Sequence, residues 1–268
     1  MKKPAISINH ESDSQKQPVS KIALITGGAR RVGRAIAQDL AQNGFSVAIH
    51  HHDSQEDAES IAEIARSFGV QAATVSGDLS DRSQYERIIA ETVGKLGTLD
   101  ILVNNASVFE NDSVLDFDWP QWDAHFRLHV DAPVALTRAF HDQLPEDRKG
   151  LVVNLIDQRV WKITPTHFSY MLSKQALWAA TRTMAQALAP RIRVNAIGPG
   201  PTLANSRQSQ QHFLNQTDAL ILKHGPQLSE FGATIRYFWN SPSITGQMIA
   251  LDGGQHLAWE TPDVLVDE

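Results

Sequence analysis

Tyr170 and Lys174 lie four positions apart in a segment, 169–188, whose apolar spacing predicts a helix. Residues at that separation share one helix face, so the phenol and the ammonium group are expected to be neighbours. A nearby ammonium favours the phenolate, and we expect it to lower the pKa of Tyr170 toward neutrality. A tyrosine tuned in this way can act as the general acid or base of a hydride transfer. A surface Tyr–Lys pair without a function is the alternative, and the pair alone does not decide between them.

Further candidate residues follow short apolar runs of the sequence. Such runs are uniformly apolar and alternate with helical patterns, which is typical of a parallel sheet covered on both faces. In these sheets, ligands bind beyond the carboxyl ends of the strands. The residues that fall at this edge are Asn105 and Ala106, Asp157, and Pro199 and Gly200.

The pattern predicts an α/β fold, a Rossmann-type doubly wound parallel sheet in three α/β/α layers, formed by a single domain over 21–257. Polar tails are expected at 1–20 and 258–268, and 201–228 is expected to be an irregular loop over the substrate. Pro133 is a possible kink in one long helix. The expected strands are 22–25, 45–49, 72–75, 99–103, 151–156, 192–196 and 248–251, and the expected helices are 32–42, 57–68, 84–96, 119–140, 169–188 and 230–239.

A glycine-rich turn follows the first expected strand. Gly27 permits a tight turn, and Gly33 allows the next helix to pack closely on the strand. The first backbone N–H groups of that helix, around Arg30, Arg31 and Val32, are then free to bind a pyrophosphate. An ordinary strand–turn–helix connection is the alternative. The position of the turn, at the start of a repeating β–α series, favours a cofactor site.

Composition excludes several classes of protein. The chain has 268 residues and a net charge of −6, whereas a protein that binds the nucleic-acid backbone needs a basic surface. It has no cysteine, which excludes disulfides and thiolate metal sites, and no apolar run long enough to span a membrane. The polar segment 1–20 lacks the apolar core of a signal peptide, so a cytoplasmic protein is expected.

Three consecutive histidines, His50, His51 and His52, raise the question of a metal site. On a strand, His50 and His52 face one way and His51 faces the other. No further cluster of ligands is evident in the sequence. We therefore expect no metal and assign these histidines to the edge of the cofactor site.

Taken together, these motifs resemble the short-chain dehydrogenase/reductase family over about residues 21–255. The glycine-rich turn, an Asn-Asn-Ala segment, a Tyr-x-x-x-Lys pair and a Pro-Gly segment occur in the family order. The resemblance implies that Tyr170 supplies a proton and that Lys174 holds the nicotinamide ribose and tunes Tyr170. It also implies a homotetramer with the two long helices at an interface, and a separate hypothesis is that the tail 258–268 reaches a neighbouring subunit's site. The implied cofactor contacts are Pro199 and Gly200 to the nicotinamide, Asn105 and Ala106 to the adenosine side, and Asp78, with Leu79, to the adenine.

Three positions depart from the common family pattern. Asp157 stands where most members carry serine, Arg31 where most carry glycine, and His129 where most carry asparagine. The combination of Thr-Gly-x-x-x-Arg-x-Gly, Asn-Asn-Ala-Ser and an aspartate 13 positions before the tyrosine resembles the pteridine reductase branch. The segments 157–174 and 245–257 look especially like bacterial dihydromonapterin reductases, which also carry the histidine.

This closer resemblance implies a substrate site for a pterin. Arg31 would bridge the cofactor phosphate and the pterin carbonyl edge, Ser107 would bond the pterin, and Phe109 would stack on its ring. Asp157 and Tyr170 would relay a proton to a ring nitrogen. The alternatives are that Arg31 binds phosphate only, that Phe109 packs within its loop, and that Asp157 pairs with Arg159 or Lys162.

Some residues favour NAD(H) as the cofactor and others favour NADP(H). Asp53 lies 20 positions after Gly33, where an acid bonds the ribose hydroxyls of NAD(H) and repels the 2′-phosphate of NADP(H). Against this, Arg30 provides a basic group, and His52 and Ser54 can donate to phosphate. We favour NADP(H), with NAD(H) as the other possibility.

Three functions are compatible with the sequence. The first is NADPH-dependent reduction of a dihydropterin to a tetrahydropterin, with the proton from Tyr170 and Asp157. The second is short-chain reduction of a non-pterin carbonyl or oxidation of an alcohol. The third is a nucleotide-binding regulator without catalysis, which His129 favours and the intact pair of Tyr170 and Lys174 disfavours.

Overall fold

The computed structural model describes residues 20–204 and 209–260, so nearly all of the two expected tails lies outside the described residues. Within these ranges, seven strands form one parallel sheet in the order β3-β2-β1-β4-β5-β6-β7. This confirms the expected Rossmann-type sheet. The strands are β1 (Ile22–Ile25), β2 (Ser46–His51), β3 (Ala72–Ser76), β4 (Ile101–Asn104), β5 (Gly150–Leu155), β6 (Ile192–Pro199) and β7 (Met248–Leu251).

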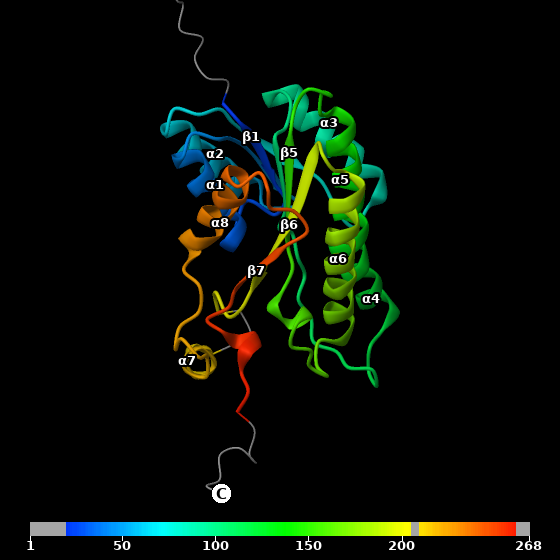
Figure 1. Cartoon of the computed structure of the whole chain (residues 1–268), viewed down its shortest axis with the longest axis vertical. Helices are drawn as coiled ribbons and strands as arrows, with labels where there is room; N and C mark the ends of the chain where they lie inside the picture. The colour runs from blue at the N-terminus through cyan, green and yellow to red at the C-terminus, as the bar shows by residue number, and fades with distance from the viewer. Residues whose placement is uncertain (1–19, 205–208, 261–268) are drawn as a thin grey trace, which may run out of the picture.

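Helices cover both faces of the sheet (Figure 1). Each face has its own apolar core, because strands buried on both sides present apolar side chains in both directions. One face is covered by α1 (Arg31–Gln42), α2 (Gln55–Ser67) and α8 (Leu228–Asn240), and the other by α3 (Tyr85–Leu96), α5 (Ala132–Gln143) and α6 (Phe168–Ala187).

The expected long helix over 119–140 is interrupted. It consists of α4 (Trp119–Phe126), a π-helical turn (Arg127–Asp131) and α5. Pro133 lies in the first turn of α5 and has no N–H to donate to the carbonyl of His129, so the α-helical hydrogen-bond pattern cannot continue through this turn. The interruption therefore precedes the proline, and it places His129 in the π turn.

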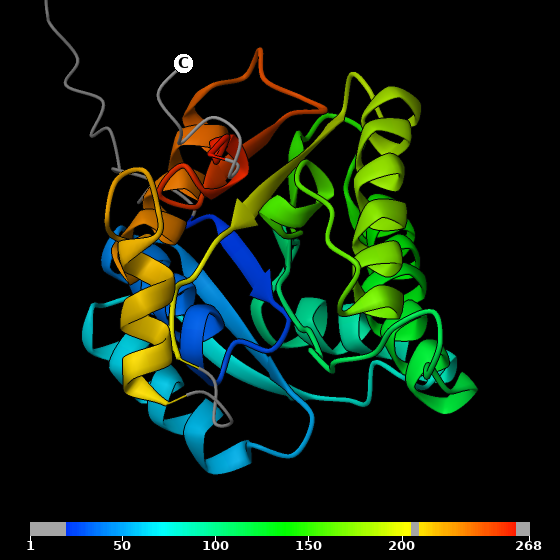
Figure 2. The same cartoon turned by 90° about the horizontal axis from the view of Figure 1, so that it is seen from below.

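The segment 201–228 is not wholly irregular, contrary to expectation, because it contains α7 (Gln210–Asp218). The side chain of Ser209 caps this helix by accepting a hydrogen bond from the N–H of His212 at 3.2 Å. No residue of α7 is buried. Because this helix covers no core, its sequence lacks the apolar spacing from which a helix is predicted. Figure 2 shows α7 beside the segment that follows β6.

The strand register brings the candidate residues to one edge. Asn104, the last residue of β4, pairs with Asn154 in β5, and Leu155 pairs with Ile197 in β6. The segments that follow these strands therefore leave the sheet side by side. Asn105, Asp157 and Pro199 reach the same edge because their strands are parallel and in register.

Gly33 sets how closely α1 approaches the turn after β1. A Cβ atom at this position would lie 2.1 Å from the carbonyl oxygen of Gly27 and 2.6 Å from Nδ2 of Asn105. Both neighbours are held by the strands that precede them. The close packing of helix and turn therefore requires a residue without a side chain.

We expect Gly33→Ala to lower the free energy of unfolding by about 2 kcal/mol or more, because overpacking a tight contact costs about 1–3 kcal/mol. Urea denaturation followed by circular dichroism measures this change. Gly94→Ala is the matched control: Gly94 lies in α3 with no atom within 4 Å of a Cβ added there, so alanine should leave stability unchanged or raise it. Equal stability of the two variants would contradict the packing argument.

Candidate active site

Tyr170 and Asp157 are joined by a hydrogen bond. The hydroxyl of Tyr170, in the first turn of α6, donates to Oδ2 of Asp157 at 2.9 Å. The other carboxylate oxygen accepts the backbone N–H of Arg159 at 2.8 Å. Asp157 follows β5 and α6 packs along β6, so the sheet itself brings the two groups together. Asp157 thus contacts both Tyr170 and its close neighbour Arg159.

Lys174 lies one helical turn beyond Tyr170 and is equally buried. Its ammonium donates to the carbonyl of Leu155 at 2.9 Å and lies 5.6 Å from the centre of the Tyr170 ring. The carbonyl at the end of β5 therefore fixes the lysine beside the tyrosine. The pair lies within the site rather than on an exposed helix surface.

Burial controls the protonation of these three groups. It raises the pKa of Asp157 and lowers the pKa of Lys174 to about 8, because a low dielectric disfavours each charged form. The pKa of Tyr170 is raised well above its ordinary value by burial and by the carboxylate of Asp157. The expectation that Lys174 lowers the pKa of Tyr170 toward neutrality is therefore wrong, since burial and Asp157 raise this pKa and only the charge of Arg159 lowers it.

A cavity of 930 Å³ opens beside these groups. Besides the predicted residues, it is lined by Arg159 and His167 and by His212 and Phe213 of α7, which sequence reasoning missed. The sequence suggests Arg159 only as a partner of Asp157. The predicted residues that line the cavity are Arg31, Val32, Asn105, Ser107, Phe109, Asp157, Tyr170, Lys174, Pro199 and Gly200.

Phe109 packs against the protein on more than one side. Its ring stacks on His167 with 4.3 Å between ring centres and meets the ring of Tyr170 edge-on at 4.7 Å. The guanidinium of Arg159 lies 5.4 Å from the ring centre. These contacts agree with the alternative that Phe109 packs within the protein. Its stacking on a substrate stays a prediction.

The glycine-rich turn is tied to the end of β4. The backbone N–H groups of Asn105 and Ala106 both donate to Oγ1 of Thr26, and the side-chain amide of Asn105 donates to the carbonyls of Thr26 and Gly27. Gly27 adopts a φ of +60°, a conformation that favours glycine. Asn105 and Ala106 therefore hold the shape of the turn as well as lying beside it.

This turn fits the diphosphate of a dinucleotide. No side chain caps the N-terminus of α1, and its first turn contains no acidic residue. The free N–H groups and the positive end of the helix dipole favour an anion there. The residues present therefore fit a nicotinamide dinucleotide, whose diphosphate the N-terminus of α1 would hold.

His50 supports the turn from β2. Its Nδ1 accepts the N–H of Gly27 at 3.2 Å, and its Nε2 lies 3.1 Å from the carbonyl of Gly77. Burial lowers the pKa of His50 to about 4, so the ring is neutral at pH 7. Sequence reasoning placed the histidines at the cofactor edge but gave no sign of this bridge, because Gly77 lies 27 residues away.

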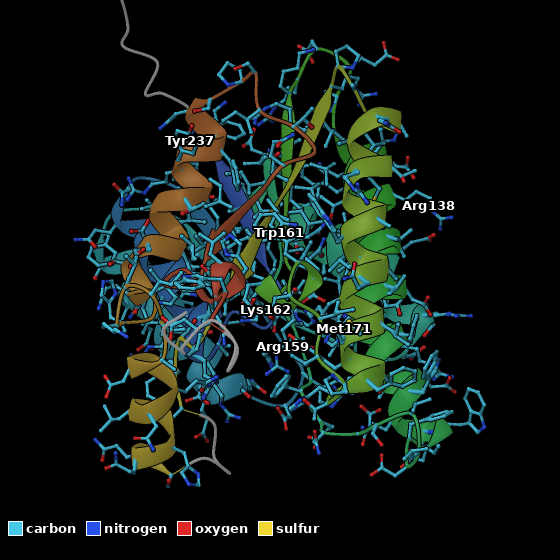
Figure 3. All side chains as sticks on the ribbon, turned by 60° about the horizontal axis from the view of Figure 1, so that its bottom comes forward. Arg138, Arg159, Trp161, Lys162, Met171 and Tyr237 are labelled. Atoms are coloured by element: carbon cyan, nitrogen blue, oxygen red, sulfur yellow. The ribbon has the colours of Figure 1, made fainter. Side chains whose placement is uncertain are left out.

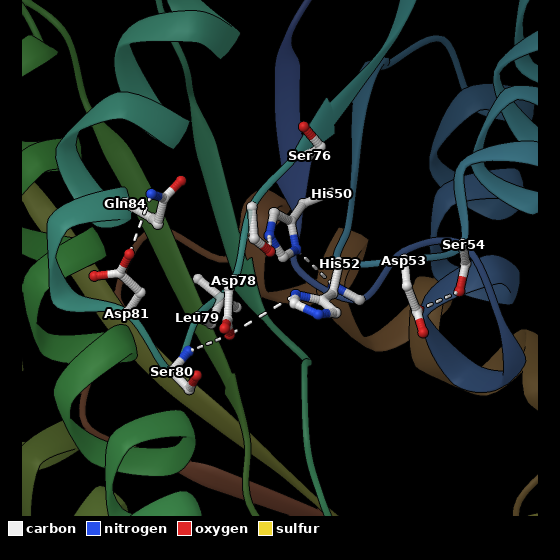
Figure 4. A network of polar contacts seen from close by, with 12 residues as sticks. His50, His52, Asp53, Ser54, Ser76, Asp78, Leu79, Ser80, Asp81 and Gln84 are labelled. Carbon is white, nitrogen blue, oxygen red and sulfur yellow. Dashed lines mark hydrogen bonds and ion pairs between the residues drawn. The ribbon is translucent and has the colours of Figure 1, made fainter.

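Polar groups gather where β2 and β3 end (Figure 4). Nδ1 of His52 lies 3.8 Å from Oδ1 of Asp78, which also accepts the N–H of Ser80. The hydroxyl of Ser54 donates to Asp53 at 3.1 Å. His52 and Asp53 are exposed, so both can exchange these contacts for bonds to a ligand. Leu79, beside Asp78, is buried, and its carbonyl accepts the hydroxyl of Tyr85.

Arg30 is already paired. Its Nε lies 2.5 Å from Oδ2 of Asp57, and both side chains are exposed. Exposed ion pairs contribute little, so a phosphate can displace this carboxylate. Arg30, Asp53, Ser54 and Asp57 line a separate hollow at the start of α2. The basic group expected near the 2′-phosphate is thus present beside two acids.

The described residues show no helix able to cross a membrane and no group of three or more histidine or acidic side chains placed to hold a metal ion.

Comparisons with known proteins decide the family. A family model described as enoyl-(acyl carrier protein) reductase matches residues 27–256. The chain belongs to the short-chain dehydrogenase/reductase family. The 3-oxoacyl-(acyl-carrier-protein) reductase FabG of Staphylococcus aureus is 28% identical over 247 residues, covering 89% of this chain and 99% of that protein.

Two solved structures illustrate the similarity. The structure of FolM alternative dihydrofolate reductase 1 from Brucella canis complexed with NADP is 54% identical, with a TM-score of 0.89, and the match covers 92% of this chain and 98% of that one. A short-chain dehydrogenase from Burkholderia cenocepacia in complex with NADP is 28% identical, with a TM-score of 0.83, covering 90% and 99%.

Arg31, where most short-chain reductases carry glycine, has a strained backbone conformation. Its φ is +52°, in the left-handed region that favours glycine, the residue expected at this position. The guanidinium donates to the carbonyls of Leu203 and Ala204 at 3.2 and 3.1 Å, and so joins the glycine-rich turn to the segment after β6. Strained residues persist where the surroundings hold them, and they concentrate at functional sites.

The alternative partner of Asp157, Lys162, points elsewhere. Its Nζ donates to the carbonyl of Ala258 at 3.3 Å. Figure 3 shows Arg159, Trp161 and Lys162 along the stretch that follows β5. The ring of Trp161 contacts His256, with 5.0 Å between ring centres. This stretch therefore holds the last described residues against the site.

We expect Arg31→Gly to keep or raise the melting temperature while it raises the KM for NADPH at least about tenfold, because glycine relieves about 1 kcal/mol of backbone strain but removes the guanidinium. Thermal unfolding and steady-state kinetics measure the two effects. Arg34→Ala, at an exposed position of the same helix, is the control and should change neither. A variant with unchanged KM would show that Arg31 does not contact the ligands.

The pKa of Lys174 predicts a pH dependence. Lys174 is protonated below about pH 8 and neutral above it, so kcat/KM should fall as the pH rises through about 8. The carboxylate of Asp157 raises the pKa of Lys174, so Asp157→Asn should move this decline to lower pH in the residual activity. pH–rate profiles of both proteins provide the measurement. A decline at the same pH in both would contradict the assignment to Lys174.

Proposed function

We propose that this short-chain reductase uses NADPH to reduce a dihydropterin to the corresponding tetrahydropterin. The hydrogen bond between Tyr170 and Asp157 is the observation that carries the proposal. A serine, the usual residue at this position, can only share a hydroxyl with the tyrosine. A carboxyl group can hold and deliver a second proton, which suits a ring nitrogen that must be protonated as the neighbouring carbon accepts hydride.

The cofactor is NADP(H), as the sequence analysis favoured. The similar structures from Brucella canis and Burkholderia cenocepacia are complexes with NADP. In this chain Arg30, His52 and Ser54 are the groups able to receive the 2′-phosphate beside Asp53. When bound, the cofactor supplies the hydride, and the residues of the chain supply the proton, the orientation and the exclusion of water.

In the proposed relay Asp157 starts protonated, and the burial that raises the pKa of Asp157 acts in this direction. The bond to Tyr170 then reverses: the carboxyl O–H donates to the phenol oxygen, and the phenol O–H is free to donate to the substrate nitrogen. As the phenol proton moves to the nitrogen, the carboxyl proton moves to the phenol oxygen. The relay leaves Asp157 as a carboxylate near the ammonium of Lys174, which stabilises the new charge.

The cavity offers partners for the edge of a pterin as well. Ser107 and Arg31 present polar groups on the same cavity as Tyr170, and the ring of Phe109 lies at its wall. A pterin displays an amide-like edge and an amino group on a flat ring, which needs such polar partners around an aromatic wall. The name of the relative with 54% identity, an alternative dihydrofolate reductase, supports this class of substrate.

A second candidate is the reduction of a carbonyl substrate. The relatives at 28% identity include reductases of 3-oxoacyl groups attached to acyl carrier protein. Asp157 would then stand in for the serine that bonds the substrate oxygen. Assembly as a homotetramer stays a prediction for either function.

The test measures NADPH oxidation with dihydrobiopterin or dihydromonapterin and, separately, with an acetoacetyl thioester. We expect turnover of the dihydropterin, and a fall of about 10²–10⁴-fold in Tyr170→Phe, because that variant keeps the ring and loses the proton donor. NADPH binding by Tyr170→Phe serves as the control for folding. Turnover of the thioester alone would establish the second candidate, and equal rates for the wild type and Tyr170→Phe would favour a regulator without catalysis.

A further inference from the structure

Two histidines and two serines link α4 and its π turn to α6. Nδ1 of His125 lies 2.7 Å from the hydroxyl of Ser169, and Nδ1 of His129 lies 2.8 Å from the hydroxyl of Ser173. The histidines are four positions apart, as are the serines, so the two hydrogen bonds form successive steps along one helix contact. We call these four residues the His–Ser ladder. All four side chains are buried, and the serines directly precede Tyr170 and Lys174.

Each step of the ladder continues into the loop after β4. Ser169 donates its hydroxyl to Asp112, whose carboxylate also accepts the backbone N–H of Ser169. His129 contacts Ser107 and Val108 through its Nε2, at 2.9 and 3.3 Å. The ladder therefore joins the loop that carries Ser107 and Phe109 to the helix that carries Tyr170 and Lys174.

The neighbours of His129 fix which of its nitrogens carries the proton. The backbone N–H of Val108 can only donate, so Nε2 must be an acceptor. The hydroxyl of Ser173 donates to the carbonyl of Tyr170 at 2.6 Å, so it must accept from Nδ1 of His129. His129 is therefore neutral with its proton on Nδ1. Burial and the charge of Lys174 hold the pKa of His129 well below its ordinary value, which keeps the ring neutral.

The state of His129 determines what Ser107 can offer a ligand. Within the protein, the hydroxyl of Ser107 faces only acceptors: Nε2 of His129 at 2.9 Å, whose lone pair it shares with the N–H of Val108, and the carbonyl of Val108 at 3.3 Å. The proton of Ser107 is thus used within the protein. Ser107 lines the cavity with its lone pairs and can receive a hydrogen bond from a ligand.

We infer that His129 is a positioning residue that makes Ser107 a hydrogen-bond acceptor, so that the site selects substrates with an N–H donor at this position over substrates that offer only a carbonyl. This inference rests on the proposed function in taking the amino or amide edge of a pterin as that donor. The histidine at position 129, where most family members carry asparagine, then has a function in substrate selection.

The tautomer can be measured without any substrate. In the ¹⁵N–¹H spectrum of protein labelled at its histidines, His129 is assigned by the signals that His129→Asn removes. At pH 7 we expect a neutral ring with the proton on Nδ1. His50 is the internal reference and should show the opposite tautomer, because Gly27 donates to its Nδ1. A charged His129 ring, or one with the proton on Nε2, would overturn the inference.

Substrate selection is measured as the ratio of kcat/KM for a dihydropterin to that for its analogue without the exocyclic amino group. We expect a ratio of at least about 10 in the wild type, the size of one hydrogen bond. His129→Asn retains an amide near the position of Nδ1 but is too short to reach Ser107, so its ratio should fall to that of Ser107→Ala. The double variant should have the same ratio as Ser107→Ala alone.

Two matched variants separate selection from folding. His129→Gln can still reach Ser107 and should keep most of the ratio. His125→Asn alters the other step of the ladder and should lower the melting temperature while leaving the ratio unchanged. An unchanged ratio in His129→Asn, or equal losses in His129→Asn and His125→Asn, would overturn the inference. If the wild type does not reduce the dihydropterin, the proposed function fails, while the tautomer measurement still decides the state of His129.

Discussion

The face of α6 that packs into the protein is polar as well as buried, and this constraint organises the site. A buried polar group without a partner costs about 1–3 kcal/mol, so each one on this face must find a hydrogen bond. Tyr170 finds it at Asp157, Lys174 at the carbonyl of Leu155, and Thr181 at Asn154. Each partner belongs to β5 or directly follows it. These hydrogen bonds therefore fix the rotation of α6 about its axis and its position along the sheet.

The same constraint explains the electrostatics of the site. Burying a carboxyl, a phenol and an ammonium together makes each charged form expensive, and the groups can lower that cost by sharing protons. Asp157 and Tyr170 share one through their hydrogen bond, and Lys174 remains close enough to balance a carboxylate. A water-filled cleft would leave the three groups independent. Here the burial that supports the fold also couples the protonation of Asp157 to that of Tyr170 and Lys174.

The sequence was sufficient for the fold because parallel strands buried on both faces are uniformly apolar and the helices between them are amphipathic. It was also sufficient to bring Tyr170, Lys174 and Asp157 to one edge, since strand ends determine where they lie. It could not predict α7, whose residues are all solvent-accessible and lack apolar spacing. Nor could it predict the ladder, because each histidine and its serine are 44 residues apart and no local pattern connects them. The direction of the pKa shift of Tyr170 depended on burial, which spacing alone does not reveal.

The π turn between α4 and α5 changes the direction in which the side chains of α5 point relative to those of α4. A π turn holds about one residue more than an α turn, and one residue corresponds to a rotation of about 100° around the axis. Before the turn, α4 faces α6 with His125; after it, α5 presents Leu136 and Phe140 to the apolar core under α3. In an uninterrupted α-helix His125 and Leu136 would point within about 20° of each other, because eleven residues at about 100° each make roughly three full turns. The extra residue of the π turn therefore rotates α5 relative to α4, so that one continuous stretch of chain directs His125 to α6 and, on a different face, Leu136 and Phe140 to the hydrophobic core.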